Sequence, residues 1–189
     1  TACGSAYHAG VVGKYVIEEL CRVPVEVELA SEPRYRNPII DEHTLLIVVS
    51  QSGETADTIA AMRECMERGA MSLAIVNVVG STIARIADHV IYTHAGPEIA
   101  VATTKGYTTQ LAALYLFAVW AAELLGKIDA QRYAGLVESI RALPSLVQRA
   151  IDLNVHVRYL AERWHGHESL FFIGRNIDYA VGMEGSLKL

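Results

Sequence analysis

Hydroxyl side chains gather in residues 50–55 (SQSGET), between an apolar run and a helical pattern. Three hydroxyls and a glycine within six residues allow a tight loop around one small anion. The first N–H groups of a helix have no intrahelical acceptor and carry a partial positive charge, so hydroxyls beside them suit a phosphate monoester. Such a site requires no lysine or arginine.

Two other stretches, residues 3–6 (CGSA) and 101–105 (VATTK), also place hydroxyls at the start of a helical pattern. In an open parallel sheet, ligands bind outside the carboxyl ends of the strands. A single Ser or Thr at such a turn is more often only a helix cap. Three enriched loops at one sheet edge leave the cap and the binding site as equally good interpretations.

The elements that would position these loops alternate between strand and helix. Continuous apolar, β-branched runs predict strands covered on both faces. The expected strands are 25–30, 44–50, 71–77 and 89–93, and the expected helices are 5–20, 55–68 and 81–87. This order predicts an α/β fold, a doubly wound parallel sheet with helices on both faces.

The second half of the chain is mostly helical. We predict helices over 103–125, over 130–150 with a break at Pro144, and over 152–164. A strand at 169–173 and a helix at 178–189 then repeat the order of the first 20 residues. We therefore expect a first unit over 1–130, connecting helices over 131–167 and the start of a second unit, cut short, over 168–189.

Composition excludes several functions. A net charge of −5 provides no basic field for nucleic acid. The three cysteines have no CxxC spacing, which argues against disulfides or a thiolate metal site and fits a cytoplasmic protein. The longest apolar run, 111–122, is too short to span a membrane. Dinucleotide and nucleoside triphosphate motifs are absent.

Other candidate residues have simpler explanations. Two histidines in 164–168 (WHGHE) fit a solvated loop better than a metal site. Cys3 fits a small buried residue better than a nucleophile, because no base accompanies it. Glu184 and Lys188, four residues apart, fit a surface ion pair. The helix over 103–125 is apolar on nearly every side, which favours an oligomer.

Four stretches together resemble the isomerase half of the glucosamine-6-phosphate synthase family, within the sugar isomerase (SIS) superfamily. They are 28–36 (ELASEPRYR), 50–58 (SQSGETADT), 98–111 (EIAVATTKGYTTQL) and 183–189 (MEGSLKL). The resemblance implies a flavodoxin-like SIS fold with a glutaminase domain in the same polypeptide, and a cytoplasmic homodimer. It implies synthesis of glucosamine 6-phosphate from fructose 6-phosphate and glutamine, the first step of hexosamine biosynthesis, with no metal or organic cofactor.

The resemblance also assigns roles to individual residues. It implies that Lys188 is catalytic, beside the reacting carbons of the sugar. The family's phosphate loop and its other sugar contacts fall on Ser50, Gln51, Ser52, Thr55, Ser5, Val101 and Thr103. Ala6 stands where a serine hydroxyl is common, so one sugar contact is in doubt.

The family's general base, a glutamate, would lie just beyond Lys188, whereas this sequence ends at Leu189. A proton cannot move between two carbons without such a group. We therefore expect the 189-residue chain alone to bind sugar phosphate weakly and to turn nothing over. Conversion of fructose 6-phosphate to glucose 6-phosphate by the purified chain would contradict this expectation.

Two alternatives remain open. The chain could belong to another SIS phosphosugar isomerase or deglycase, which would lack an upstream glutaminase domain. It could instead belong to a non-catalytic SIS module that senses a phosphosugar and regulates transcription. That module would carry an upstream helix-turn-helix domain and no glutamate beyond Lys188.

Overall fold

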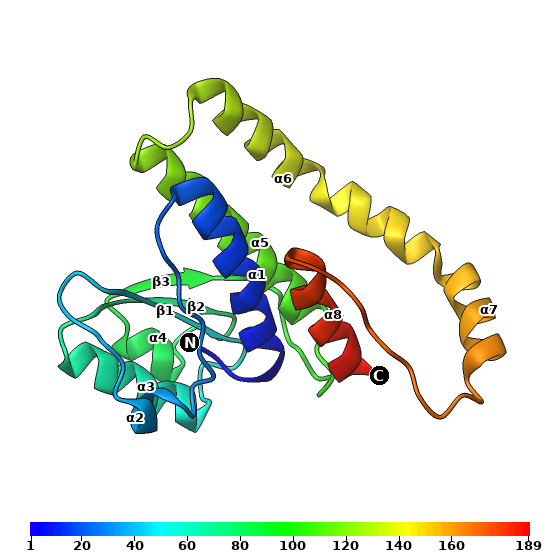
Figure 1. Ribbon diagram of the computed structural model, residues 1–189, viewed down its shortest axis with the longest axis horizontal. Helices are drawn as coiled ribbons and strands as arrows, with labels where there is room; N and C mark the ends of the chain where they lie inside the picture. The colour runs from blue at the N-terminus through cyan, green and yellow to red at the C-terminus, as the bar shows by residue number, and fades with distance from the viewer.

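The computed structural model describes residues 1–189 and contains a three-stranded parallel sheet flanked by helices (Figure 1). The strands are β1 (Leu45–Ser50), β2 (Met71–Val76) and β3 (His89–Tyr92), in the order β1-β2-β3. The sequence prediction of these three strands is confirmed to within one residue at each end. Their apolar runs form strands because both faces of the sheet are covered.

The N-terminal residues extend the sheet beyond β1. The Thr1 amino group donates to the Ile47 carbonyl at 2.7 Å, and the Val49 N–H donates to the Thr1 carbonyl at 3.2 Å. Ala2 in turn forms a single parallel bridge with Leu29. The strand expected over 25–30 is therefore wrong in extent, because only Ala2 pairs with that segment.

Helices cover both faces of the sheet (Figure 1). On one face lie α1 (Gly4–Cys21) and α5 (Lys105–Leu124), which pack against each other. On the other lie α3 (Ala56–Glu67) and α4 (Thr82–Ile86), with the short α2 (Pro33–Arg36) against α3. The predicted doubly wound α/β architecture is confirmed.

Alternate side chains of β1 and β2 supply two separate cores. Val49 and Ile75 pack into a cluster with residues of α1 and α5. Val48 and its neighbours on the opposite face pack against Met62 of α3 and Ile83 of α4. All five side chains are at most 2% exposed, which shows that the sheet is buried on both faces.

Helix α5 is the least polar helix, and one of its faces is exposed. Its inner face packs closely on α1, where a Cβ at Gly13 would lie 3.1 Å from the Leu114 side chain. On the opposite face, Leu116, Trp120 and Leu124 are each more than half exposed. The expectation of an oligomer rests on this apolar face and stays a prediction.

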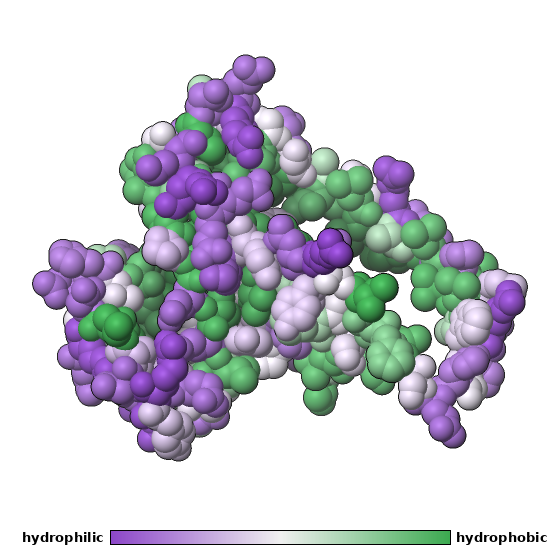
Figure 2. Space-filling model, in the orientation of Figure 1, coloured by the Kyte–Doolittle hydropathy of each residue, from purple (hydrophilic) through white to green (hydrophobic).

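Helices α6 (Ala130–Asp152) and α7 (Asn154–Trp164) extend away from the sheet (Figure 1). Apolar side chains gather along α6 in Figure 2, and neither helix buries a residue. The predicted break at Pro144 is wrong. Helix α6 continues through the exposed Pro144, although a proline removes one hydrogen bond of its own helix. No helix combines the length and apolar character that a membrane crossing requires.

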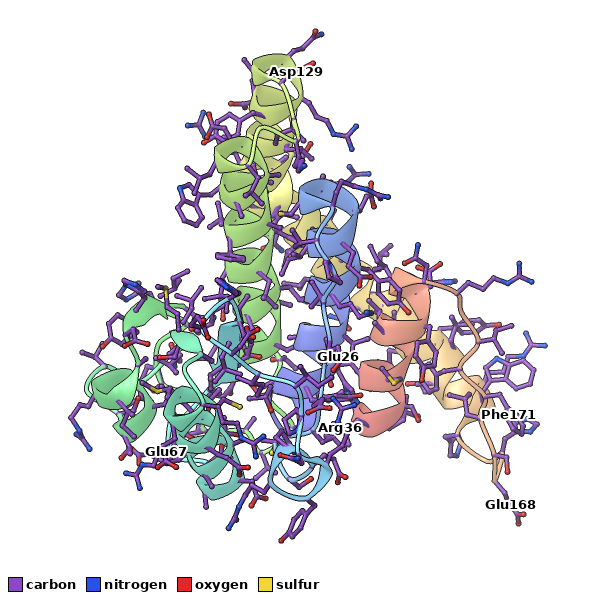
Figure 3. All side chains as sticks on the ribbon, turned by 60° about the vertical axis from the view of Figure 1, so that its left-hand side comes forward. Glu26, Arg36, Glu67, Asp129, Glu168 and Phe171 are labelled. Atoms are coloured by element: carbon purple, nitrogen blue, oxygen red, sulfur yellow. The ribbon has the colours of Figure 1, made fainter.

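The strand expected over 169–173 does not form. No neighbouring strand pairs with this segment, and Phe171 lies at the outer edge of the molecule in Figure 3, 87% exposed. A strand without a partner leaves its backbone groups without hydrogen bonds, so the segment stays irregular. The predicted C-terminal helix is confirmed as α8 (Ile177–Lys188), which packs against α1.

Two methionines near the core between β1, β2 and α3 should differ strongly in how much they contribute to stability. Met62 is fully buried, whereas Met71 at the start of β2 is 54% exposed. We expect Met62→Ala to lower the free energy of unfolding by about 2–5 kcal/mol, because it leaves a cavity. Met71→Ala should lower it by less than about 1 kcal/mol. Denaturant unfolding of both variants tests this, and equal losses would contradict the described core.

Candidate functional site

A cavity of about 200 Å³ lies outside the carboxyl ends of the strands. Its lining comes from four places in the sequence: the start of α1, the end of β1 with the following loop, the loop before α5, and α5 itself. The lining residues are Cys3, Ser5, Ala6, Val49, Ser50, Gln51, Ser52, Thr55, Val101, Thr103 and Gln110. All seven pocket residues expected from the sequence are therefore brought together.

The cavity sits where the chain changes from one face of the sheet to the other. After Thr1–Ala2 the chain enters α1 on one face, and after the neighbouring β1 it enters α3 on the opposite face. Loops that leave adjacent strands in opposite directions open a crevice between them. Both helices begin at this crevice, so the residues at their N-terminal ends face the same space.

The loop over 50–55 is held by hydrogen bonds on its inner side. The buried Ser50 hydroxyl accepts a hydrogen bond from the Gly53 N–H at 3.0 Å. The Gly53 carbonyl accepts from the Ile83 N–H at 3.0 Å, and the Gln51 carbonyl accepts from the Asn77 N–H at 3.2 Å. These contacts fix the loop against α4 and the end of β2.

Glu54 completes this anchoring from the rim. Its carboxylate accepts a hydrogen bond from the Thr82 N–H at 2.7 Å, at the start of α4. Hydrogen bonding by Thr82 lowers the pKa of Glu54, so the carboxylate stays ionised at neutral pH. The charge of Glu54 is therefore directed at α4 and not at the cavity.

Thr55 supplies free donors toward the cavity. It is the N-cap residue of α3, yet its hydroxyl makes no capping hydrogen bond. The first N–H groups of α3 have no acceptor within their own helix. A hydroxyl and several N–H groups at one helix end can together bind an anion, as expected for this loop. Ser52 lies beside them and accepts from the Glu54 N–H at 3.2 Å.

The loop before α5 forms a second wall. The Thr103 hydroxyl donates to the Glu98 carboxylate at 2.8 Å, and this hydrogen bond lowers the pKa of Glu98. A Cβ at Gly106 would lie 3.4 Å from the Gln51 side chain, so α5 approaches the first loop closely. With its proton directed at Glu98, the Thr103 oxygen offers lone pairs to a ligand. Val101 lines the cavity although its side chain is fully exposed.

Lys188, at the end of α8, contacts Ser5, a residue that lines the cavity. Its ammonium donates to the Ser5 hydroxyl at 2.8 Å and lies 2.9 Å from the Glu184 carboxylate. The other oxygen of Glu184 lies 2.8 Å from the His8 imidazole. The expectation of a surface ion pair is wrong, because the Glu184 side chain is only 6% exposed. A spacing of four residues shows that two side chains of a helix can meet, but it does not show whether they face solvent or the protein interior.

Sequence reasoning missed two residues of this region and predicted the wrong burial for a third. Gln110 lines the cavity from the second turn of α5 and is 3% exposed. The only indication of this in the sequence was a polar residue within an otherwise apolar helix. Nothing in the sequence marks His8, one helical turn after Gly4, as part of this region, because its partner Glu184 comes from the distant helix α8. Cys3, expected to be buried, is partly exposed in the cavity, with its sulfur 3.8 Å from the Thr58 hydroxyl.

Other possible sites are less organised. A wider hollow of about 530 Å³ lies between α2 and α3, away from the three loops. Its lining mixes arginines and glutamates, and Arg68 there is paired with Glu64 at 2.7 Å. No three His, Cys, Asp or Glu side chains are grouped to hold a metal ion. His165 and His167 are exposed at the end of α7.

Comparison with known proteins places this geometry in a family. A family model described as SIS domain matches residues 1–120, the part that carries the sheet and all of the residues that line the cavity. The chain belongs to the SIS domain family. Lys188, Glu184 and the rest of α8 lie outside the matched range.

Longer proteins contain a region similar to this whole chain. Glutamine–fructose-6-phosphate aminotransferase (isomerizing) from Symbiobacterium thermophilum is 56% identical over 188 residues. The protein of the same name from Methanosarcina mazei is 47% identical over 188 residues. All of this chain is covered in both cases, but it spans only 31% and 30% of those relatives.

Solved structures show the same fold. The C-terminal domain of glucosamine-fructose-6-phosphate aminotransferase from Francisella tularensis has a TM-score of 0.95 and 38% identity. This chain aligns over 98% of its length with 53% of that structure. A putative phosphosugar isomerase from Silicibacter pomeroyi has a TM-score of 0.83 and 30% identity, covering 99% of this chain and 54% of that one.

Two glycines with positive φ provide a matched test of the loop. Gly53 (φ +67°) lies within the loop over 50–55, where a Cβ would sit 2.5 Å from the Ser81 Cβ and nearer still to the Ser81 hydroxyl. Gly80 (φ +73°) has open space at the same position. Alanine at either position costs about 1–2 kcal/mol of backbone strain. We expect Gly53→Ala to cost at least about 1 kcal/mol more, because it also overpacks. Equal unfolding free energies would contradict the described packing.

Proposed function

We propose that this chain binds a sugar phosphate in the cavity and forms the sugar-isomerising part of a longer enzyme. That enzyme would make glucosamine 6-phosphate from fructose 6-phosphate and glutamine. The observation that carries the proposal is the convergence of three hydroxyl-bearing loops on one cavity, with the Thr55 hydroxyl and the α3 N–H groups uncommitted. The names of the similar proteins support the choice of substrate.

The phosphate would bind at residues 50–55. Its oxygens would accept hydrogen bonds from Ser52, Thr55 and the first N–H groups of α3, assisted by Ser50 and Gln51. Several such donors compensate the charge of a phosphate without a cationic side chain. The sugar would then extend toward Ser5, Thr103 and the backbone at Val101, which line the rest of the cavity.

Lys188 would act on the sugar carbons. Its ammonium donates to Ser5, a residue of the cavity outside the loop over 50–55. Moving a proton between neighbouring carbons of a carbonyl sugar builds negative charge on an oxygen, and a fixed cation stabilises that charge. The side chains that line the cavity include no carboxylate and no imidazole. The base would therefore come from another residue of the longer protein.

The rest of that protein would supply the nitrogen. The curated relatives are about three times as long as this chain and are named for the use of glutamine, which supports a glutaminase domain in the same polypeptide. We also propose that 168–189 begins a second SIS unit, with 131–167 as the connection. Because α8 already contacts α1, that second unit would pack directly beside the first.

A phosphosugar sensor is the second candidate. The absence of a carboxylate among the cavity side chains is the observation that favours it. Binding would look the same for both proteins, but only the enzyme would turn over substrate. Incubation of the full-length protein with fructose 6-phosphate and glutamine separates them, since formation of glucosamine 6-phosphate rules out a sensor.

Replacement of Thr55 tests the phosphate loop. Thr55→Val keeps the shape of the side chain and removes its hydroxyl. A hydrogen bond to a charged group contributes about 1.5–3 kcal/mol, so we expect affinity for glucosamine 6-phosphate to fall about tenfold or more. Isothermal titration calorimetry of the full-length protein measures this.

The matched control is Thr108→Val, because Thr108 is exposed on α5 and bonds only to carbonyls of its own helix. Its affinity should equal that of the unmodified protein. Glucosamine without phosphate should bind too weakly to measure in any variant. Unchanged affinity in Thr55→Val, or equal binding of glucosamine, would overturn the assignment of the phosphate to this loop.

A further inference from the structure

Glu184 is a buried carboxylate at the contact between α8 and α1. The residue is 5% exposed, and each of its oxygens faces a different partner. Oε2 lies 2.8 Å from Nδ1 of His8, and Oε1 lies 2.9 Å from Nζ of Lys188. The same ammonium donates to the Ser5 hydroxyl at 2.8 Å. A continuous polar chain therefore runs from His8 through Glu184 and Lys188 to a residue of the cavity.

The carboxylate remains charged despite its burial. Burial alone would raise the pKa of Glu184, but Lys188, His8 and Ser5 together outweigh it and hold the pKa below its ordinary value. At neutral pH Glu184 is therefore ionised. The nearby Tyr107 hydroxyl is buried without a partner, and burial and the Glu184 charge raise the pKa of Tyr107 to about 12. Glu184 is thus suited to hold a cation and poorly suited to release a proton.

We propose that Glu184 is a positioning residue, which fixes the Lys188 ammonium against Ser5 at the edge of the cavity. This inference rests on the proposed function and adds to it the group that orients the lysine. A free lysine side chain has four rotatable bonds and many accessible positions. Glu184 restricts the ammonium, and His8 restricts Glu184 by holding its second oxygen. Lys188 touches the substrate, whereas Glu184 acts only through Lys188.

Other pairs at helical spacing in this chain lack these features. Arg158 and Glu162 on α7 are 78% and 66% exposed, and nothing else contacts the carboxylate of Glu162. Exposed ion pairs of this kind contribute little to stability, because water solvates the two separated charges almost as well as the pair. The carboxylate of Glu184 also leaves Oε1 without a well-directed hydrogen bond. The ammonium of Lys188 is the charged group that lies nearest to this oxygen, at 2.9 Å.

The first test replaces Glu184 in the full-length enzyme. Glu184→Gln keeps the size of the side chain and its contact with His8 but removes the charge. We expect kcat for glucosamine 6-phosphate formation to fall at least about tenfold, since small displacements of a catalytic group have effects of this size. KM for fructose 6-phosphate should stay nearly unchanged, because the phosphate loop is intact. The control, Glu162→Gln, should leave both constants unchanged.

A double-variant cycle separates positioning from a general structural role. If Glu184 acts only through Lys188, then Glu184→Gln should have no further effect on kcat in the Lys188→Met background. Independent, multiplicative losses would overturn the proposal. An unchanged kcat in the single Glu184→Gln variant would overturn it as well.

A crystal structure of the Glu184→Gln protein provides a readout that does not depend on activity. The Lys188 ammonium should lie beyond hydrogen-bond distance from the Ser5 hydroxyl. An ammonium that stays on Ser5 would overturn the positioning role even if the enzyme were slow. If the unmodified full-length protein makes no glucosamine 6-phosphate, the proposed function fails, and this structural outcome still decides what Glu184 does.

Discussion

The candidate site depends on one constraint, the burial of the parallel sheet on both faces. Because α1 and α5 cover one face and α3 and α4 the other, the chain must leave adjacent strands in opposite directions. Parallel strands all end at the same edge, so each following helix begins there with N–H groups that lack acceptors. The arrangement of the sheet creates the crevice and its N–H donors, and the hydroxyl residues add further donors of the kind that an anion requires.

Some polar groups of the candidate site make hydrogen bonds within the protein, and others have no hydrogen-bond partner in it. Ser50, Glu54 and Glu98 direct their hydrogen bonds to the protein itself, at Gly53, Thr82 and Thr103. The Thr55 hydroxyl makes no capping hydrogen bond, and the first N–H groups of α3 have no acceptor within their own helix. Buried polar groups are costly without hydrogen bonds, so this division keeps the loops rigid while leaving donors for a ligand.

The sequence predicted the elements whose pattern is local and missed those that depend on a distant neighbour. The apolar runs of β1, β2 and β3 were clear, because strands covered on both faces are apolar throughout. Segments 25–30 and 169–173 have similar residues but lack a partner along their length, which no local pattern reveals. The local rule that a proline interrupts a helix failed at Pro144, where α6 continues. The loop over 50–55 was singled out as a candidate site from its hydroxyls, and it does line the cavity, whereas the inward direction of Glu184 required the position of α8.

The contact between Lys188 and Ser5 joins residues 183 positions apart in the sequence. The loop over 50–55, by contrast, is held by residues no more than about 30 positions away, at Asn77, Thr82 and Ile83. Closing a long segment costs more chain entropy than closing a short one, so the contact between Lys188 and Ser5 costs more chain entropy to form than the contacts of the loop. The loop over 50–55 can form as soon as β1, β2 and α4 assemble. Lys188 meets Ser5 only when α8 docks on α1, so local detachment of that helix would separate the two residues and leave the loop over 50–55 intact.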